Sequence, residues 1–480
     1  MRRLIVFGLS LGIAVISPAA PAASASAAPA YALTDVGTFG GPQASLDLPG
    51  FPITRQGAVL GTADTTVADS DYPNFNPFIV GYPNPVLSHA FKWQRGKLTD
   101  LGALPGNNSS AVFQVNGSGV GTGMSETGAL DPNTGYPAEN AVLFKNGSVI
   151  NLGTLPGGHE GQATAINDRG QVAGFADNGV PDPVSMFGPV NGPGDPGWVT
   201  QSRSFIWQDG KMQDLGTLGG PDALMTTLNA RGQIAGDSYT NATPNPANGG
   251  VPTTHPFLWQ DGHMRDLGTL GGTRSGTSWL NNRGEVVGQD NLAGDQAFHP
   301  FLWDGKHLRD LGTLGGDFGA ANHVNDAGDV TGWATPPDNI TAHAFLWKRG
   351  VMTDLTGADT SQCTVAEAIN NRDQVVGSTC DEQDALLWTG GKQHDLNALV
   401  APSGIHLTSA VFITDQGQIA AVGLLPNGNQ HVFLLTRTNS ALGAAASSIS
   451  RQSGGHDFMN PISTPSKRFL PKGGHSAVGG

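Results

Sequence analysis

The chain has 480 residues and a formal net charge of −14, although only 13% of its residues are charged. The acidic balance argues against a nucleic-acid-binding protein, because such proteins need a basic surface for the phosphate backbone. Gly (69 residues) and Pro (32 residues) are frequent, and 38% of the residues are apolar. Since the apolar residues come in short regular runs, the composition indicates a turn-rich all-β protein rather than a helical or disordered one.

The N-terminal segment, residues 1–30, is predicted to be a secretory signal peptide. Two arginines precede an apolar run, Leu4–Ile16, which has the length of a signal-peptide core and is short for a membrane span. Small residues follow with two A-x-A cleavage patterns, after which the mature chain would begin at Ala28 or Tyr31. An uncleaved anchor helix is the alternative. No later segment has the length needed to cross a bilayer, so the mature protein is expected to have no membrane span.

From Tyr31 onward, three short motifs recur in a fixed order, and each occurs eight times. The first has the form H-A-F-L-W, as in His255–Trp259, and the second has the form D-L-G-T-L-G-G, as in Asp266–Gly272. The third has the form I-N-x-x-G-Q-V-x-G, as in Ile166–Gly174. A unit that repeats about every 44 residues is typical of repeat architectures in which each unit is one supersecondary element.

Each repeat is predicted to be a four-stranded meander. In the third motif, Asn and Gly enclose two polar residues, as in a type I turn followed by a left-handed Gly, so this motif forms a hairpin of two strands. The H-A-F-L-W run is apolar on both alternating faces, which indicates a third strand that is buried on both sides. A tight turn such as Asp261 and Gly262 then leads into a fourth strand.

The predicted fold class is all-β, with a single closed β-propeller over residues 31–437. The chain opens with a lone fourth strand, Tyr31–Gly37, and ends with a first, second and third strand at Leu407–Thr436. Together these strands would complete one blade and clasp the termini, which gives about eight four-stranded blades. Seven blades are an alternative because the first unit is irregular. A β-solenoid is another, although its rungs are usually shorter.

The motifs resemble those of the HAF-type extracellular repeat family, which is named for the His-Ala-Phe of the third strand. The resemblance covers residues 31–437 and rests on the order and spacing of all three motifs. It implies an extracellular repeat protein, and the family has no activity that is generally assigned to it. Local departures are Asn140, Arg203 and Asp384 in place of the His, and Leu435 in place of the Trp.

Histidines and aspartates recur at equivalent positions of the repeats, which is a structural pattern rather than a catalytic one. These residues are His89, His255, His299, His343 and His431, and Asp100, Asp214, Asp266 and Asp310. Metal ligands must converge, whereas equivalent positions in different blades lie far apart. We therefore expect each His to form hydrogen bonds inside its own blade, and each Asp to accept bonds from nearby backbone N–H groups. Asp69 and Asp71 resemble a calcium loop only weakly, and we assign no metal, cofactor or catalytic residue.

The two cysteines, Cys363 and Cys380, are predicted to form a disulfide. In an oxidising compartment a lone pair of cysteines favours this pairing. They flank one hairpin of the first and second strands and lie almost equally far from its turn at Asn371 and Arg372. Cross-strand neighbours are close enough for a disulfide, although a bulge in this hairpin would shift the register by one residue.

Long insertions fall mainly between the second and third strands, so they are expected on one face of the propeller. Aromatic side chains on loops above a rigid scaffold suit the recognition of a polysaccharide or a surface protein. The alternative is that these rings fold onto their own loops. The candidate ligand-binding residues are Tyr72, Phe75, Tyr82, Tyr136, Trp198, Tyr239 and Trp333.

Residues 438–480 are rich in Ala, Ser and Gly and carry several basic residues, which predicts a disordered, mildly basic tail. The whole pattern favours a secreted, monomeric binding module for glycan or protein ligands. Two alternatives stay open: a propeller hydrolase or lyase that acts on extracellular polysaccharide, and a structural surface protein without a specific ligand. The enzyme would need acids from several blades on the central axis, and nothing in the sequence shows that Asp64, Glu126, Asp177 and Asp237 converge.

Overall fold

The computed structural model describes residues 30–46, 52–54, 56–75, 84–186, 199–246, 250–356 and 362–438. These residues form 32 β-strands and the short 3₁₀-helix η2 (Leu396–Leu399), so the predicted all-β class is confirmed. The predicted signal peptide up to residue 29 and the predicted tail from residue 439 lie outside the described residues. In the described part of the chain, no helix is long and apolar enough to span a membrane.

The strands form eight antiparallel groups of four, which we number sheets 1 to 8 in chain order. Sheet 1 comprises β2 (Ala44–Ser45), β3 (Val59–Ala68), β4 (Val86–Gln94) and β5 (Lys97–Gly102). Sheet 2 comprises β6 (Ser110–Val115), β7 (Gly121–Leu130), β8 (Pro137–Lys145) and β9 (Ser148–Gly153). Sheet 3 comprises β10 (Gly161–Ile166), β11 (Val172–Pro181), β12 (Thr200–Gln208) and β13 (Lys211–Asp214). Sheet 4 comprises β14 (Ala223–Leu228), β15 (Ile234–Tyr239), β16 (Thr254–Gln260) and β17 (His263–Asp266).

The second half of the chain repeats this order. Sheet 5 comprises β18 (Gly271–Leu280), β19 (Val286–Leu292), β20 (Phe298–Trp303) and β21 (Leu308–Asp310). Sheet 6 comprises β22 (Gly319–Val324), β23 (Val330–Ala334), β24 (His343–Lys348) and β25 (Val351–Asp354). Sheet 7 comprises β26 (Thr364–Ile369), β27 (Val375–Thr379), β28 (Ala385–Thr389) and β29 (Lys392–Asp395). Sheet 8 combines β30 (His406–Ile413), β31 (Ile419–Leu424) and β32 (Gln430–Arg437) with β1 (Tyr31–Asp35) from the other end of the chain.

The turns between the first and second strands and, outside sheet 8, those between the third and fourth strands contain the predicted residues of positive φ. Gly170 follows the first turn of sheet 3 with a φ of +76°, and in sheet 7 Asp373 takes the same left-handed conformation at +58°. Asn146 and Gly147 both have positive φ, as a type I′ hairpin between the third and fourth strands requires. The last Gly of the third motif allows close packing, because a Cβ on Gly174 would overlap the carbonyl oxygen of Gln162 in the neighbouring strand.

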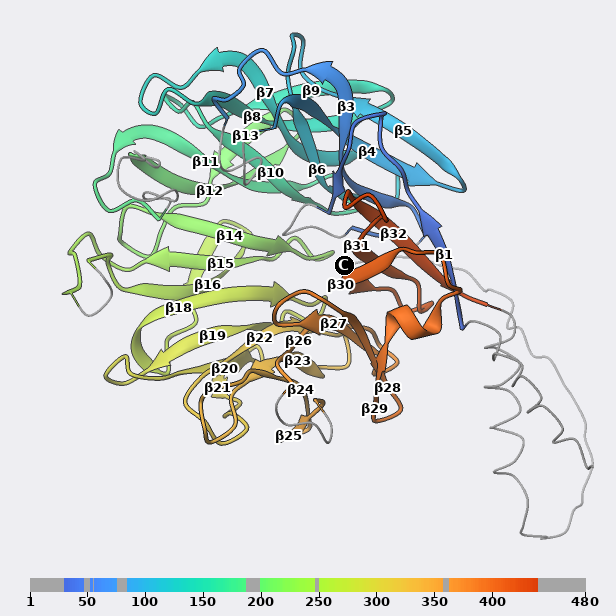
Figure 1. The fold of residues 1–480 in the computed structure, drawn as a ribbon. Helices are drawn as coiled ribbons and strands as arrows, with labels where there is room; N and C mark the ends of the chain where they lie inside the picture. Colours follow the sequence, from blue (N-terminus) through green and yellow to red (C-terminus); the bar gives the residue numbers. More distant parts are fainter. Residues whose placement is uncertain are drawn as a thin grey trace, which may run out of the picture.

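Consecutive sheets pack face to face through shared clusters of buried apolar side chains. Between sheets 5 and 6, for example, Val287 and Leu302 meet Val324 and Phe345. A cluster of this kind joins every consecutive pair of sheets, and the cluster that contains Val59, Phe91 and Val432 joins sheet 8 to sheet 1. Figure 1 shows the sheets following one another around a common centre. The predicted eight four-stranded units are therefore present in a propeller-like arrangement, in which no sheet closes on itself.

The two ends of the described chain lie side by side in sheet 8. Strand β1 pairs with β32, with Tyr31 opposite Arg437 and Asp35 opposite Phe433 (Figure 1). The four strands of this sheet follow the order β1-β32-β31-β30, so an N-terminal strand completes a C-terminal meander as predicted. A single parallel bridge, Arg203 to Ala223, additionally links sheet 3 to sheet 4.

Candidate functional site

The repeated His and Asp residues are partners of one another within each sheet. The His of the third strand bonds through Nδ1 to the Asp of the fourth strand, with 2.9 Å between His255 and Asp266. The Asp carboxylate also accepts a backbone N–H two residues further on, as Gly268 donates to Asp266 at 2.8 Å. The hydrogen bonding expected within each blade is present, although its His–Asp partnership was not foreseen from the sequence. The equivalent pairs are His89–Asp100, His299–Asp310, His343–Asp354 and His431–Asp35.

Two sheets that lack the His keep a link at the same place. Arg203 forms an ion pair with Asp214 at 3.2 Å, and Asn140 donates to Asn151 at 3.1 Å. The third and fourth strands are thus joined by different chemistry at one structural position. In the described residues, no group of three or more His, Cys, Asp or Glu side chains could hold a metal ion.

The aromatic residues predicted to bind a ligand are placed very differently from one another. Tyr72 is 51% exposed, whereas Tyr239 is buried at the end of β15. Phe75 and Tyr136 are half-buried on neighbouring loops, which the hydrogen bond from Asn74 Nδ2 to the carbonyl of Gly135 joins at 3.0 Å. Trp333 lies edge-on to Phe298, with 5.9 Å between the ring centroids. Tyr82 and Trp198 lie outside the described residues.

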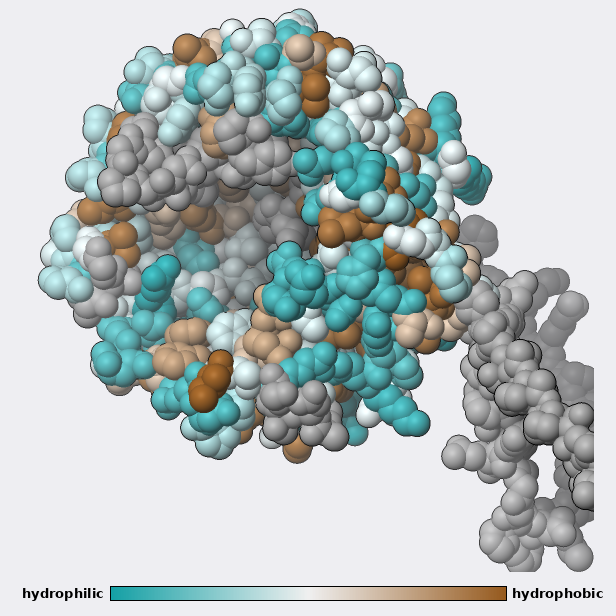
Figure 2. Space-filling model, in the orientation of Figure 1, coloured by the Kyte–Doolittle hydropathy of each residue, from teal (hydrophilic) through white to brown (hydrophobic). Residues whose placement is uncertain are grey.

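A cavity of about 390 Å³ lies where the first strands of the sheets end, and the first turns of all eight sheets contribute to its lining. We call it the axial cavity. Figure 2 shows the molecule hollowed at its centre, inside the circle of sheets. The axial cavity opens among the short turns between the first and second strands, rather than among the long insertions that the sequence favoured as the binding face. Its location follows from packing eight sheets around one centre.

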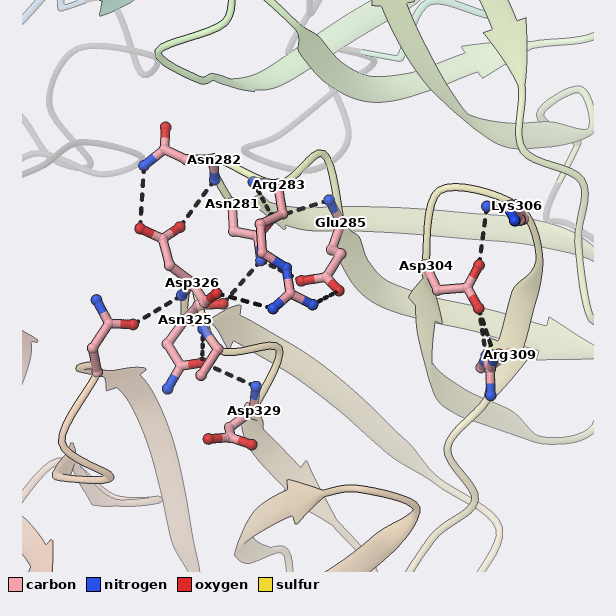
Figure 3. A network of polar contacts seen from close by, with 12 residues as sticks. Asn281, Asn282, Arg283, Glu285, Asp304, Lys306, Arg309, Asn325, Asp326 and Asp329 are labelled. Atoms are coloured by element: carbon pink, nitrogen blue, oxygen red, sulfur yellow. Dashed lines mark hydrogen bonds and ion pairs between the residues drawn. The ribbon is translucent and has the colours of Figure 1, made fainter.

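Asparagine side chains connect the turns around the axial cavity. Asn325 Nδ2 donates to the carbonyl of Asn370 in the next sheet at 3.0 Å, while Asn325 Oδ1 accepts the backbone N–H of Asp329 in its own turn at 2.9 Å. Figure 3 shows this arrangement for Asn281 and Asn325 in sheets 5 and 6. The Asn of the third motif therefore shapes its own turn and ties it to the following sheet. The same side-chain donation is made by Asn116, Asn167, Asn229, Asn281 and Asn370.

Three carboxylates line the mouth of the axial cavity, one residue after this asparagine position. Asp168, Asp326 and Asp415 each accept a backbone N–H from the turn of the preceding sheet, at 2.6, 3.1 and 2.9 Å respectively. These groups thus have a structural role in linking the turns. The described residues of the lining include no Lys or Arg. The neighbouring turn residue Arg283 donates instead to the carbonyl of Asp326 and to Glu285 (Figure 3).

An aromatic cluster of Trp279, His323 and Phe412 lines the inner part of the axial cavity. The ring centroids of Trp279 and His323 are 4.3 Å apart, and Phe412 lies 5.9 Å from His323. All three residues occupy the position just before the apolar-Asn or apolar-Thr pair of the third motif. Three other repeats have the small residues Ala165, Thr227 and Ala368 there. An alignment of the repeats shows this departure, which is the sequence signal for the cluster.

His323 is a buried polar group without a hydrogen bond. Its side chain lies in the centre of the cluster, and the residue is 8% exposed. Within the described part of the chain, neither Nδ1 nor Nε2 has a hydrogen-bond partner. Burial lowers the pKa of His323 to about 3, so the imidazole is neutral at physiological pH. A neutral imidazole carries one donor and one acceptor, and leaving both unpaired in the protein interior costs free energy.

No protein-family model and no curated protein matches this sequence. Among solved structures, similarity is found to an acylaminoacyl peptidase of Pyrococcus horikoshii, with 11% identity, a TM-score of 0.36 and coverage of 73% of this chain and 51% of that one. Dipeptidyl peptidase 4 of Porphyromonas gingivalis has 10% identity and a TM-score of 0.44, with coverage of 77% of this chain and 56% of that one. A Trypanosoma rangeli sialidase has 9% identity and a TM-score of 0.32, with coverage of 88% of this chain and 62% of that one. The chain thus spans less than two thirds of each of these proteins, and similarities of this size say nothing about activity.

Proposed function

We propose that the protein is a secreted binding module of the HAF-type repeat class, built as a closed eight-bladed propeller, and that a glycan enters its axial cavity. The packing of sheet 8 against sheet 1 and the pairing of β1 with β32 support the closed ring. The disulfide between Cys363 and Cys380 is consistent with an oxidising compartment outside the cell. The signal-peptide pattern of residues 1–30 supports export.

The observation that carries the binding proposal is the cluster of Trp279, His323 and Phe412 inside the axial cavity. A repeat that tolerates Ala at this position does not need large rings there for packing alone. Concave sites with aromatic walls and a few convergent polar groups are the usual form of small-ligand sites. Sugars suit such a site, because their C–H faces pack on aromatic rings while their hydroxyls bond to amides such as Gln114 in the lining.

The carboxylates near the axis support binding rather than catalysis. In the described first strands of the sheets, Glu367 is the only acid, and it does not line the axial cavity. The mouth residues Asp168 and Asp326 already accept backbone N–H groups that link the turns. A glycosidase needs two carboxyl groups on either side of the scissile bond, with one free to donate a proton. The hydrolase or lyase alternative would therefore need acids beyond these.

A glycan and cell-wall array, probed with the secreted full-length chain and its variants, tests the proposal. We expect Trp279→Ala to reduce binding of the captured glycan at least about tenfold, which is 1.4 kcal/mol. Trp279→Phe should retain much of the affinity, which would show that the alanine variant does not fail merely by unfolding. The matched control is Tyr72→Ala, an exposed aromatic on the insertion face. Loss of binding in Tyr72→Ala but not in Trp279→Ala would move the site to that face, and turnover of an arrayed polymer would contradict a non-enzymatic role.

A further inference from the structure

We infer that the axial cavity accepts an uncharged, hydroxyl-bearing sugar ring at the end of a glycan, and that His323 hydrogen-bonds to one of its hydroxyl groups. This inference rests on the proposed function and specifies its ligand. Four features of the axial cavity carry it: the charge of its lining, its exposed ring faces, the unpaired polar atoms inside it and its size.

The charged groups of the described lining are all acidic. Asp168, Asp326 and Asp415 stand at the mouth, and two basic side chains of the neighbouring turns contact the protein instead. Arg169 donates to the carbonyl of Ala230 at 2.8 Å, and Arg283 pairs with Glu285. A sugar that carries a carboxylate or sulfate would therefore approach three negative charges without a compensating cation in the described lining. Like charges in such an arrangement disfavour the anionic ligand.

The aromatic rings favour a ligand that has a flat apolar face and polar groups at its edge. Trp279 and Phe412 are both half-buried, so part of each ring is accessible from the axial cavity. A pyranose presents C–H groups on its faces and hydroxyls around its rim. Its faces can therefore pack against these rings while its hydroxyls remain free for hydrogen bonds. An organic cation could also pack on aromatic rings, so the polar atoms must decide between the two.

The unpaired ring nitrogens of His323 favour a ligand hydroxyl over a quaternary ammonium. Its two ring nitrogens, one donor and one acceptor, have no partner in the described residues. A hydroxyl group both donates and accepts, so it can serve either nitrogen, whereas a quaternary ammonium can serve neither. Both nitrogens are shielded from water where Trp279 packs over His323, so the bound sugar must shift the Trp279 ring slightly to reach them. Forming the missing hydrogen bond would offset the cost of that shift.

The opposite wall supplies a second polar contact. Gln114 in sheet 2 uses its Oε1 to accept the backbone N–H of Ile166 at 3.0 Å, which leaves its amide nitrogen as a donor toward the axial cavity. Sheets 2 and 6 are four sheets apart in a ring of eight, so Gln114 faces His323 across the axis. The volume of about 390 Å³ lies at the small end of ligand pockets. It suits about one or two sugar rings that enter end-on, rather than a long stretch of polymer.

Calorimetric titration of the secreted full-length chain with matched oligosaccharides tests the inference. The probes share one linkage and differ only in the terminal residue, which is glucose, N-acetylglucosamine or glucuronic acid. We expect the glucose probe to bind at least about tenfold more tightly than the glucuronate probe. His323→Phe should weaken glucose binding about tenfold without lowering the melting temperature, because it keeps a ring in the cluster and removes the unpaired nitrogens.

Asp168→Asn gives an independent measure of the charge effect. The amide keeps an oxygen to accept the N–H of Gly117 and removes one negative charge, so the discrimination against glucuronate should shrink. Equal binding of glucuronate and glucose, failure of all neutral probes, or unchanged affinity in His323→Phe would each overturn the inference. If a different ligand class still bound in a manner that depended on Trp279, the proposed function would stand. Loss of both the neutral-sugar preference and the Trp279 dependence would contradict the inference and the proposed function together.

Discussion

Several buried carboxyl groups on the insertion side of sheets 2 and 3 have raised pKa values. Glu139 and Glu160 are almost fully buried, and the backbone N–H of Glu139 donates to Glu160 Oε2 at 3.1 Å. Burial raises the pKa of both groups. The negative charge of Glu126 adds to the effect on Glu139, and that of Glu139 adds to the effect on Glu160. Burial likewise raises the pKa of Glu126 to about 7. The folded protein therefore holds protons that the unfolded chain would release.

These pKa shifts make the folded state less stable as the pH rises. Below the ordinary Glu pKa of 4.5, both states are protonated and no penalty arises. Between this value and the raised pKa values, at about 7 for Glu126 and higher for Glu139 and Glu160, the unfolded chain ionises and the folded state does not. We expect the melting temperature to fall between pH 5 and pH 9. Glu139→Gln should flatten this fall, while Asp209→Asn, at an exposed turn position, should leave it unchanged. A melting temperature that rises over this range would contradict the assignment.

The residues of the axial cavity show how far a sequence can identify a site. The Asn and Gly of the third motif predict a turn, because a turn depends on residues adjacent in the chain. The bond from Asn325 to the carbonyl of Asn370 joins two turns far apart in the chain, so no local pattern indicates it. Trp279, His323 and Phe412 meet for the same reason, since they come from sheets 5, 6 and 8. The aromatic type of Tyr239 predicts a binding role, yet its position in β15 buries the side chain.

At the scale of the element, the hairpin of the first two strands is fastened at its open end in several ways. In sheets 1 and 2, Asp64 and Glu126 accept the backbone N–H groups of Gln43 and Ser109, which precede the first strands. In sheet 6, Thr335 Oγ1 accepts the backbone N–H of Phe318 at 3.2 Å. In sheet 7 the disulfide takes this place. Asp64 and Glu126, two of the acids considered for catalysis, thus hold hairpins together and do not line the axial cavity.

The predicted disulfide is confirmed, with 5.3 Å between the Cα atoms of Cys363 and Cys380. Thr364 lies opposite Thr379, so the cysteines follow in register, and the bulge between Ala366 and Ala368 lies closer to the turn. Because the closed loop is short, we expect Cys363→Ser with Cys380→Ser to lower the free energy of unfolding by at most about 3 kcal/mol. Urea unfolding measures this, with the reduced wild-type chain as the control. Two reactive thiols in the native secreted protein, or equal stability of the variant, would contradict this role.

At the scale of the whole molecule, the arrangement could be predicted because one unit is repeated and no sheet is stable alone. The Phe of the first motif is fully buried in six sheets, where it packs between neighbours; these residues are Phe91, Phe205, Phe257, Phe301, Phe345 and Phe433. Every sheet therefore needs a neighbour on both sides, which only a ring provides without leaving an apolar end. The periodic sequence pattern therefore predicts that each sheet packs between two neighbours. The face that carries the cavity depends on how the inner strands converge, which periodicity does not reveal.

We expect closure of the proposed ring to depend on the N-terminal strand. Removing residues 31–37 would delete β1, the partner of β32, and would leave His431 without Asp35, to which it bonds at 2.9 Å. The exposed edge of β32 would then invite pairing with other chains, and sheet 8 would lose its fourth strand. We expect the melting temperature to fall by at least about 5 °C, with a broader transition and larger species in size-exclusion chromatography. The control is a chain that begins at Ala30 and keeps β1. If the deleted chain unfolds at the same temperature and remains monomeric, the ring does not need this strand, and closure must rest on the packing of Val432 and Leu434 against sheet 1 alone.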